Sequence, residues 1–286
     1  MSSIKYLKSS VALLVVFFAT CASALDIGLC KFGVENMQFR GGAGDQVSCL
    51  LRHVKPRGAG STAQVIPSWL LSNVGKPNLI SPQQMSSYLA AIKVQPSQVG
   101  VVVSSIDLAQ ARYFVIHDTS SPVFEKFPSD INDLAWSGND LRRFKTSEVA
   151  KKVHVVTNRV GDSLTLQDLA VQRKSPATKL EESGVVPKSR NYFIHVENVQ
   201  PREQPAGSWP WVAPNPAFTS PQVKRLALIY VVSSVRAGRW LIPAYHFNVD
   251  SGATPKEPHD DPQGFNLDGW VNEVSSIVDD IQLSKK

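Results

Sequence analysis

Three short runs of aromatic and β-branched residues constrain the fold of this chain more than any other feature of its sequence. They lie at residues 113–116, 153–156 and 192–196, and their composition is typical of buried β-strands. Two later segments have the spacing of helices: residues 220–238 begin at a Ser-Pro pair, and residues 268–283 are amphipathic. Strands that alternate with helices predict an α/β domain with a mixed central β-sheet flanked by helices.

Histidine is concentrated at the ends of these apolar runs. Five of the six histidines of the chain lie there, namely His117, His154, His195, His246 and His259. Histidine is the usual neutral nitrogen ligand of zinc, and a catalytic zinc takes three protein ligands and keeps one position open for water. The pattern therefore indicates a zinc hydrolase. For His154 and His195 taken singly, a hydrogen-bonded structural role is the simpler interpretation.

The run at residues 192–196 leads directly into Glu197. Alternate residues of a strand face the same way, so His195 and Glu197 are expected on one side of the sheet. Because a carboxylate at the end of an apolar strand is expensive to bury alone, Glu197 is either a member of a salt bridge or a residue of the functional site.

Five motifs together resemble a known family. They are residues 115–119 (Val-Ile-His-Asp-Thr), 154–162 (His-Val-Val-Thr-Asn-Arg-Val-Gly-Asp), 194–197 (Ile-His-Val-Glu), 243–246 (Pro-Ala-Tyr-His) and 261–265 (Asp-Pro-Gln-Gly-Phe). In this order they are similar to the motifs of the type 2 N-acetylmuramoyl-L-alanine amidases, a family that includes bacterial muropeptide amidases, phage lysozyme-amidases and peptidoglycan-recognition proteins. The resemblance covers residues 105–275, whereas the first hundred residues match no pattern of the family.

The resemblance implies a metal centre and a reaction. Zn²⁺ would be bound by His117, His246 and Asp261, in a fold like that of the zinc amidases, and a water in the open position would become acidic. Glu197 would act as the general base. The bond cleaved would be the amide between N-acetylmuramic acid and L-alanine, so the expected partner is peptidoglycan or its soluble muropeptides.

One position departs from the family. Many members have a lysine two residues before the third ligand, where it helps to hold the oxyanion, and this chain has His259 there. An imidazole could take over that catalytic task. The neighbouring triplet also leaves Asp260 or His259 open as the third ligand, although the Asp261–Pro262 pair favours Asp261. The alternatives are therefore a catalytically weak protein that binds peptidoglycan, and a hydrolase that cleaves some other amide.

The first 24 residues have the pattern of a secretory signal peptide. Lys5 and Lys8 form a basic start, residues 11–19 are apolar, and the small residues 22–24 suit a cleavage site. A lipoprotein anchored at Cys21 is the rival interpretation. We therefore predict an exported protein, periplasmic or extracellular, in which Cys30 and Cys49 are left to form a disulfide. Two unconnected buried thiols are the alternative.

The remaining chain divides at about residue 100. Residues 25–100, with a helix expected from Ser81 to Lys93, are predicted to be an N-terminal extension or small subdomain, and residues 101–286 the zinc amidase-like domain. Loss of Lys5 and Lys8 lowers the formal net charge from +6 to +4. A mildly basic exported protein suits an acidic cell-envelope polymer. The sequence has no basic block of the nucleic-acid-binding type and no apolar segment beyond the leader long enough to cross a membrane.

Overall fold

The computed structural model describes residues 26–56, 59–104, 108–170, 175–184, 186, 189–205, 211–257 and 259–283. The signal peptide predicted at residues 1–24 lies outside these ranges. Among the described helices, none has both the length and the apolar character that a membrane crossing requires.

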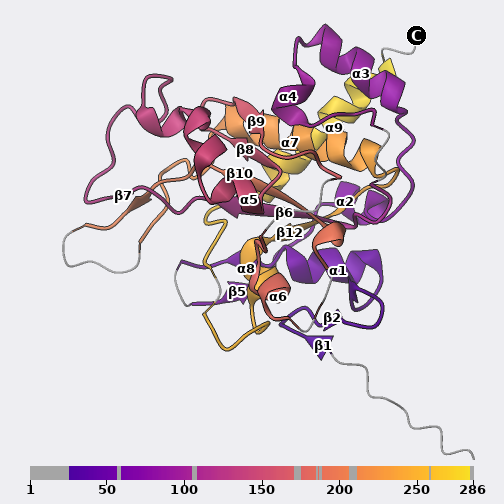
Figure 1. Cartoon of the computed structure of the whole chain (residues 1–286), viewed down its shortest axis with the longest axis horizontal. Coiled ribbons are helices and arrows are strands. Elements are labelled where there is room, and N and C mark those ends of the chain that lie inside the picture. Colours follow the sequence, from indigo (N-terminus) through magenta and orange to yellow (C-terminus); the bar gives the residue numbers. More distant parts are fainter. Residues whose placement is uncertain are drawn as a thin grey trace, which may run out of the picture.

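A five-stranded mixed sheet forms the centre of the molecule (Figure 1). Its strands follow the order β12 (Ile242–Tyr245), β6 (Tyr113–Asp118), β10 (Phe193–Asn198), β8 (Val155–Thr157) and β9 (Ser163–Thr165). The first four strands run parallel, and β9 pairs with β8 in the antiparallel direction. The three predicted strands thus become β6, β8 and β10, and the prediction of an α/β fold with a mixed central sheet is confirmed.

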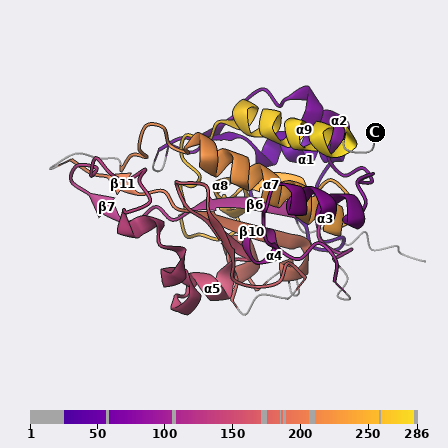
Figure 2. The same cartoon turned by 90° about the horizontal axis from the view of Figure 1, so that it is seen from above.

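Two long helices cover one face of this sheet. They are α7 (Ser220–Arg236), whose N-cap Thr219 accepts a hydrogen bond from the backbone of Gln222, and α9 (Leu267–Leu283). Figure 2 shows the two helices packed side by side, and α7 contacts β8 and β10. The shorter helices α3 (Pro82–Ala91) and α4 (Pro96–Val99) pack against α7. Ser81 caps α3 through a reciprocal capping box, as its sequence predicts.

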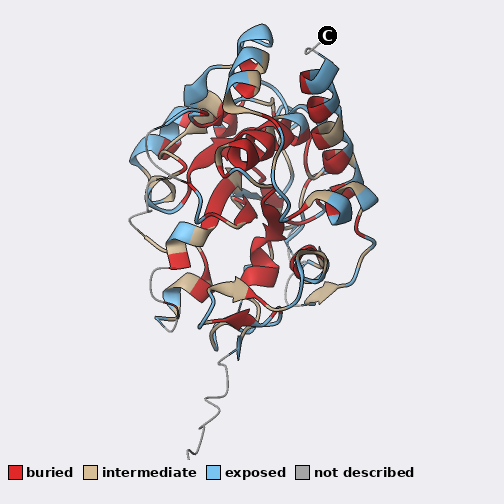
Figure 3. Cartoon of the chain, turned by 90° about the vertical axis from the view of Figure 1, so that its right-hand side faces the viewer, coloured by how far each residue is buried: buried red, intermediate tan, exposed pale blue. Residues whose placement is uncertain are grey.

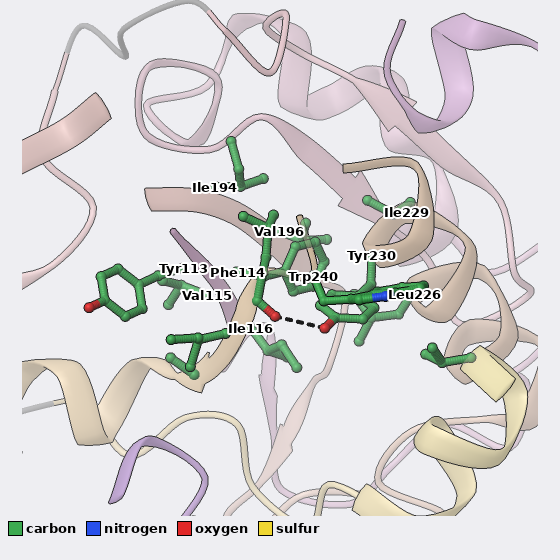
Figure 4. Close-up of a cluster of buried hydrophobic side chains, with 14 of the residues drawn as sticks. Tyr113, Phe114, Val115, Ile116, Ile194, Val196, Leu226, Ile229, Tyr230 and Trp240 are labelled. Carbon is green, nitrogen blue, oxygen red and sulfur yellow. Dashed lines mark hydrogen bonds between the residues drawn. The ribbon is translucent and has the colours of Figure 1, made fainter. Parts of the chain in front are cut away.

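Aromatic side chains join the sheet to these helices (Figure 4). Phe114 of β6 meets Tyr230 of α7 with ring centroids 5.3 Å apart, and Tyr230 meets Trp270 of α9 at 4.9 Å. The Tyr230 hydroxyl donates a hydrogen bond to the carbonyl of Leu241 at 2.7 Å, so its one polar atom is satisfied inside the core. Burial of each such ring stabilises the fold by about 1.5–3 kcal/mol.

The N-terminal residues cover the opposite face. They form the strands β1 (Asp26–Ile27), β2 (Phe32–Gly33) and β3 (Gln38–Phe39) and the helix α1 (Ala43–Leu50). Phe32 and Phe39 pack on Tyr113 and Phe193 of the sheet. The predicted Cys30–Cys49 disulfide is present and ties the loop after β1 to α1. One continuous hydrophobic core holds buried residues of both the N-terminal part and the sheet, and Figure 3 shows this core enclosed by exposed loops and helix faces.

The other elements are short and lie around the sheet. They are β4 (His53–Val54), β5 (Ser61–Thr62), α2 (Ser68–Asn73), β7 (Val123–Phe124), the 3₁₀ helices η1 (Ser137–Asn139) and η2 (Leu141–Thr146), α5 (Val149–Lys152), α6 (Lys179–Glu182), the 3₁₀ helix η3 (Ser189–Tyr192), β11 (Arg202–Glu203) and α8 (His246–Asp250).

Candidate metal centre

The parallel strands β12, β6 and β10 bring three polar side chains to one edge of the sheet. His117 is the fifth residue of β6, and Glu197 lies directly opposite it in β10. His246 follows β12 immediately as the first residue of α8. Because the carboxyl ends of parallel strands meet at the same edge, residues far apart in the sequence converge there, which is the usual position of ligand sites in such sheets.

Asp261 reaches the same place from the loop between α8 and α9. Its backbone carbonyl accepts a hydrogen bond from the N–H of Phe247 at 2.9 Å, and its Oδ2 accepts one from the N–H of Asp118 at 3.1 Å. Both contacts attach the loop to residues next to His246 and His117. The position of the carboxylate is therefore fixed by the same strand ends that carry the two imidazoles.

His117, His246 and Asp261, which we call the inner set, lie close enough together to hold a metal ion. His246 Nδ1 lies 2.9 Å from Asp261 Oδ1, and His117 Nδ1 lies 3.8 Å from Asp261 Oδ2. One ligand atom from each residue falls within 4.8 Å of the others. A tetrahedral zinc with bonds of about 2.05 Å separates its ligand atoms by about 3.3 Å, a value between these two distances.

Burial of the inner set supports the same interpretation. The exposed fractions of His117, His246 and Asp261 are 3%, 3% and 1%. Among the described residues, Asp261 Oδ1 has no hydrogen-bond partner of acceptable angle, although it is buried. A buried carboxylate oxygen without such a partner is costly unless a cation compensates it. Two imidazoles and a carboxylate therefore fit a divalent metal ion in both geometry and charge.

In each imidazole of the inner set, Nε2 contacts a further side chain. His117 Nε2 lies 2.7 Å from His195 Nδ1, and His195 Nε2 lies 3.5 Å from Glu181 Oε1. His246 Nε2 lies 2.9 Å from Asp250 Oδ2. Partners of this kind favour the tautomer that carries its proton on Nε2, and in that tautomer the lone pair is on Nδ1, the nitrogen close to Asp261.

The carboxylates around His246 determine the charge of its imidazole. Burial lowers the pKa of His246, but the nearby carboxylates of Asp250 and Asp261 outweigh it and raise the pKa well above its ordinary value. The imidazole therefore holds a second proton at neutral pH.

Glu197 is partly exposed at the rim of the site, beside His117. Burial and then the negative charges of Asp261 and Asp118 raise the pKa of Glu197 to about 8, against smaller opposing effects of His246 and Lys152. A dication bound by Asp261 would compensate that negative charge and lower the pKa of Glu197. The carboxyl is thus able to accept and release a proton near neutral pH, as a general base must.

His259 and Asp260 differ from Asp261 in what they contact. The ring of His259, an exposed residue, lies 4.9 Å from the ring of His246, and His259 forms a possible metal-binding group with His246 and Asp250. The Asp260 carboxylate accepts a hydrogen bond from the side chain of Gln263 at 2.8 Å. Of the three candidates for the third ligand, Asp261 is therefore the one that the structure groups with both His117 and His246.

A buried ion pair between Arg202 and Asp118 stabilises the loop that carries Asp261. Arg202 Nη2 donates to both carboxylate oxygens of Asp118, at 2.7 and 2.8 Å, and the backbone N–H of Gln263 donates to Asp118 Oδ2 at 3.1 Å. Since the backbone N–H of Asp118 also holds Asp261, this pair fixes the loop that carries the third ligand. The sequence gives no sign of the role of Arg202, which lies 84 residues from Asp118.

Comparison with known proteins reveals no relative of this chain. No protein-family model matches it, and neither a curated protein nor a solved structure matches it.

Proposed function

We propose that this chain is an exported, zinc-dependent amidase with the fold of the type 2 N-acetylmuramoyl-L-alanine amidases. Its reaction would be hydrolysis of the amide between N-acetylmuramic acid and L-alanine in peptidoglycan. The observation that carries the proposal is the convergence of His117, His246 and Asp261 at the carboxyl edge of the sheet, with Glu197 beside them. The substrate class follows from the resemblance of the sequence motifs.

The residues of the site have separate tasks under this proposal. A zinc ion held by the inner set would lower the pKa of a bound water and polarise the scissile carbonyl. Glu197 would take the proton of that water and pass it to the leaving amine of L-alanine. His259 would stand where the family has lysine and donate a hydrogen bond to the developing oxyanion.

The test is an assay of purified protein on defined muropeptides. We expect release of free stem peptide, loss of the activity with a chelator, and its recovery with Zn²⁺. Mass spectrometry of the products identifies the bond that is cut, and a cut at any other amide would mean a different hydrolase. Binding of muropeptides without cleavage would exclude the amidase.

A matched pair of variants separates the chemistry from the fold. Glu197→Gln keeps all three ligands, so it should still bind one Zn²⁺ per chain, whereas turnover should fall by about 10²- to 10⁴-fold. Glu125→Gln alters an exposed glutamate and should behave like the wild type in both respects. A Glu197→Gln variant with near wild-type turnover would exclude the proposed mechanism.

A second candidate is a catalytically weak protein that binds peptidoglycan. The observation that favours it is His259, which stands at the position of the family lysine and packs against His246. On this alternative the muropeptides bind at the same edge of the sheet, and addition of Zn²⁺ yields no free stem peptide. The product assay distinguishes the two candidates directly.

A further inference from the structure

A second group of metal-binding side chains lies on the other side of the His246 ring. Asp250 follows His246 by one turn in α8, and its Oδ2 is 2.9 Å from His246 Nε2. The ring of His259 is nearly perpendicular to that of His246, at 4.9 Å between centroids. One ligand atom from each of the three residues falls within 4.8 Å of the others. We call His246, Asp250 and His259 the outer set.

The contact between His246 and Asp250 is a buried ion pair. Among the described residues, neither His246 Nε2 nor Asp250 Oδ2 has a hydrogen-bond partner of acceptable angle, although the two atoms are in contact and both are buried. The other oxygen of Asp250 accepts the backbone N–H of Lys179 at 2.5 Å, which fixes the carboxylate. A proton on His246 Nε2 stabilises this pair, and a cation bound to both atoms would stabilise it in the same way.

We propose that the outer set is a second binding site for a divalent transition-metal cation, and that it shares His246 with the inner set so that only one of the two sites is filled at a time. Two imidazoles and a carboxylate are donors that zinc and cobalt accept. His259 is exposed whereas Asp250 and His246 are buried. The outer site therefore opens to solvent at His259, whereas all three residues of the inner set are buried.

The exclusion follows from the chemistry of a single imidazole. A neutral ring has one N–H and one lone pair. When the inner set holds the metal, the lone pair is on Nδ1 and the Nε2 proton faces Asp250. When the outer set holds it, the lone pair is on Nε2 and the Nδ1 proton is donated to Asp261 Oδ2, 3.0 Å away. If both sites were occupied, the His246 ring would have to lose its last proton. Two dications would also lie on opposite sides of the same ring and repel each other.

The experiment measures binding of Co²⁺ alone, by its visible absorption and by metal analysis, and needs no substrate. Asp261→Asn belongs only to the inner set and keeps an oxygen that accepts the backbone N–H of Asp118. We expect this variant to bind one Co²⁺ in the outer site. Adding His259→Ala should weaken that binding by at least about tenfold, whereas adding His53→Ala, an exposed histidine of β4, should leave it unchanged.

Each result decides one part of the proposal. Failure of folded Asp261→Asn to bind Co²⁺, or binding that does not depend on His259, would overturn the outer site. Two Co²⁺ bound at once to the wild type would overturn the exclusion. Circular dichroism establishes that the variants are folded, and His117→Ala serves as a second inner-set variant with the same expected result.

This proposal rests on the proposed function only through the shared residue His246. If the outer site fails while the wild type binds zinc and cleaves muropeptides, the amidase proposal stands. If cobalt binding depends on His259 while the wild type cleaves nothing, the outer site stands and the amidase fails.

Discussion

The raised pKa of Glu197 makes a direct prediction about stability that can be tested without any substrate. In chelated protein, Glu197→Gln replaces a carboxyl whose pKa is raised from 4.5 to about 8 by burial and by the charges of Asp261 and Asp118. The folded state thus holds this proton more tightly than the unfolded state does. This proton contributes its full stabilisation below about pH 4.5. The contribution is lost as the pH rises to about 8, and the free energy of unfolding does not change further on account of Glu197 above that pH.

The magnitude follows from the size of the shift. The difference between 4.5 and about 8 corresponds to about 5 kcal/mol at most. Because Glu197 is partly exposed, screening by solvent reduces this to about 2–3 kcal/mol. For a chain of this size, each kcal/mol shifts Tm by roughly 2–4 °C, so Tm should change by roughly 4–12 °C.

The assay is thermal unfolding of both proteins with chelator between pH 5 and 9. The wild type should lose stability relative to Glu197→Gln as the pH rises, and the difference should level off above pH 8. Glu125→Gln is the control and should follow the wild type throughout. A difference between wild type and Glu197→Gln that stays constant from pH 5 to 9 would refute the electrostatic account of the site. With Zn²⁺ at pH 8, the wild type should gain more stability than the variant.

Three further predictions concern the residues that support the site. Arg202→Met leaves a buried carboxylate without its counter-ion and should lower the free energy of unfolding by about 3–5 kcal/mol in urea titrations; an unchanged value would contradict the buried pair. Glu181→Gln removes the charge behind His195 and should weaken zinc affinity by about 10- to 100-fold in competition with a chelating dye, and equal affinity would exclude this support. Reduction of the Cys30–Cys49 disulfide should cost about 3 kcal/mol of stability, measured in urea with and without reductant, and no change would show that the closed loop contributes nothing.

The elements of the fold could be predicted from the sequence because their signals are local. The strands β6 and β10 and the helices α7 and α9 each have the composition or periodicity of their own structure. Boundaries depend on pairing partners instead. The strand expected at residues 153–156 is β8 (Val155–Thr157), because it begins where it pairs with the carboxyl end of β10.

The functional site was only partly accessible from the sequence. Strand alternation correctly placed His195 and Glu197 on one face, but the meeting of His117, His246 and Asp261 depends on parallel pairing between distant strands, and only the family motifs suggested it.

The residues that contact the Nε2 side of the two imidazoles could not be predicted from the sequence. Glu181 shows the reason: it is the third residue of α6, and one of its oxygens accepts the backbone N–H of Thr178 in a capping box. The capping role is a sufficient reason for a glutamate at this position, so the sequence does not indicate any further contact. Its contact with His195 arises from tertiary packing alone.

The protons of the site lead to a last prediction, about what zinc displaces. At neutral pH the metal-free protein holds a second proton on His246, because the carboxylates of Asp250 and Asp261 raise its pKa, and a proton on Glu197, because burial and then the charges of Asp261 and Asp118 raise its pKa to about 8. A dication bound by the inner set takes the lone pair of His246 and compensates the charge that raises the pKa of Glu197. Zinc binding at pH 7 should therefore release about two protons, and about one in Glu197→Gln. Isothermal titration calorimetry in buffers of different ionisation enthalpy measures this number. Equal release from the two proteins would mean that Glu197 does not sense the metal, and it would then be a poor choice for the general base.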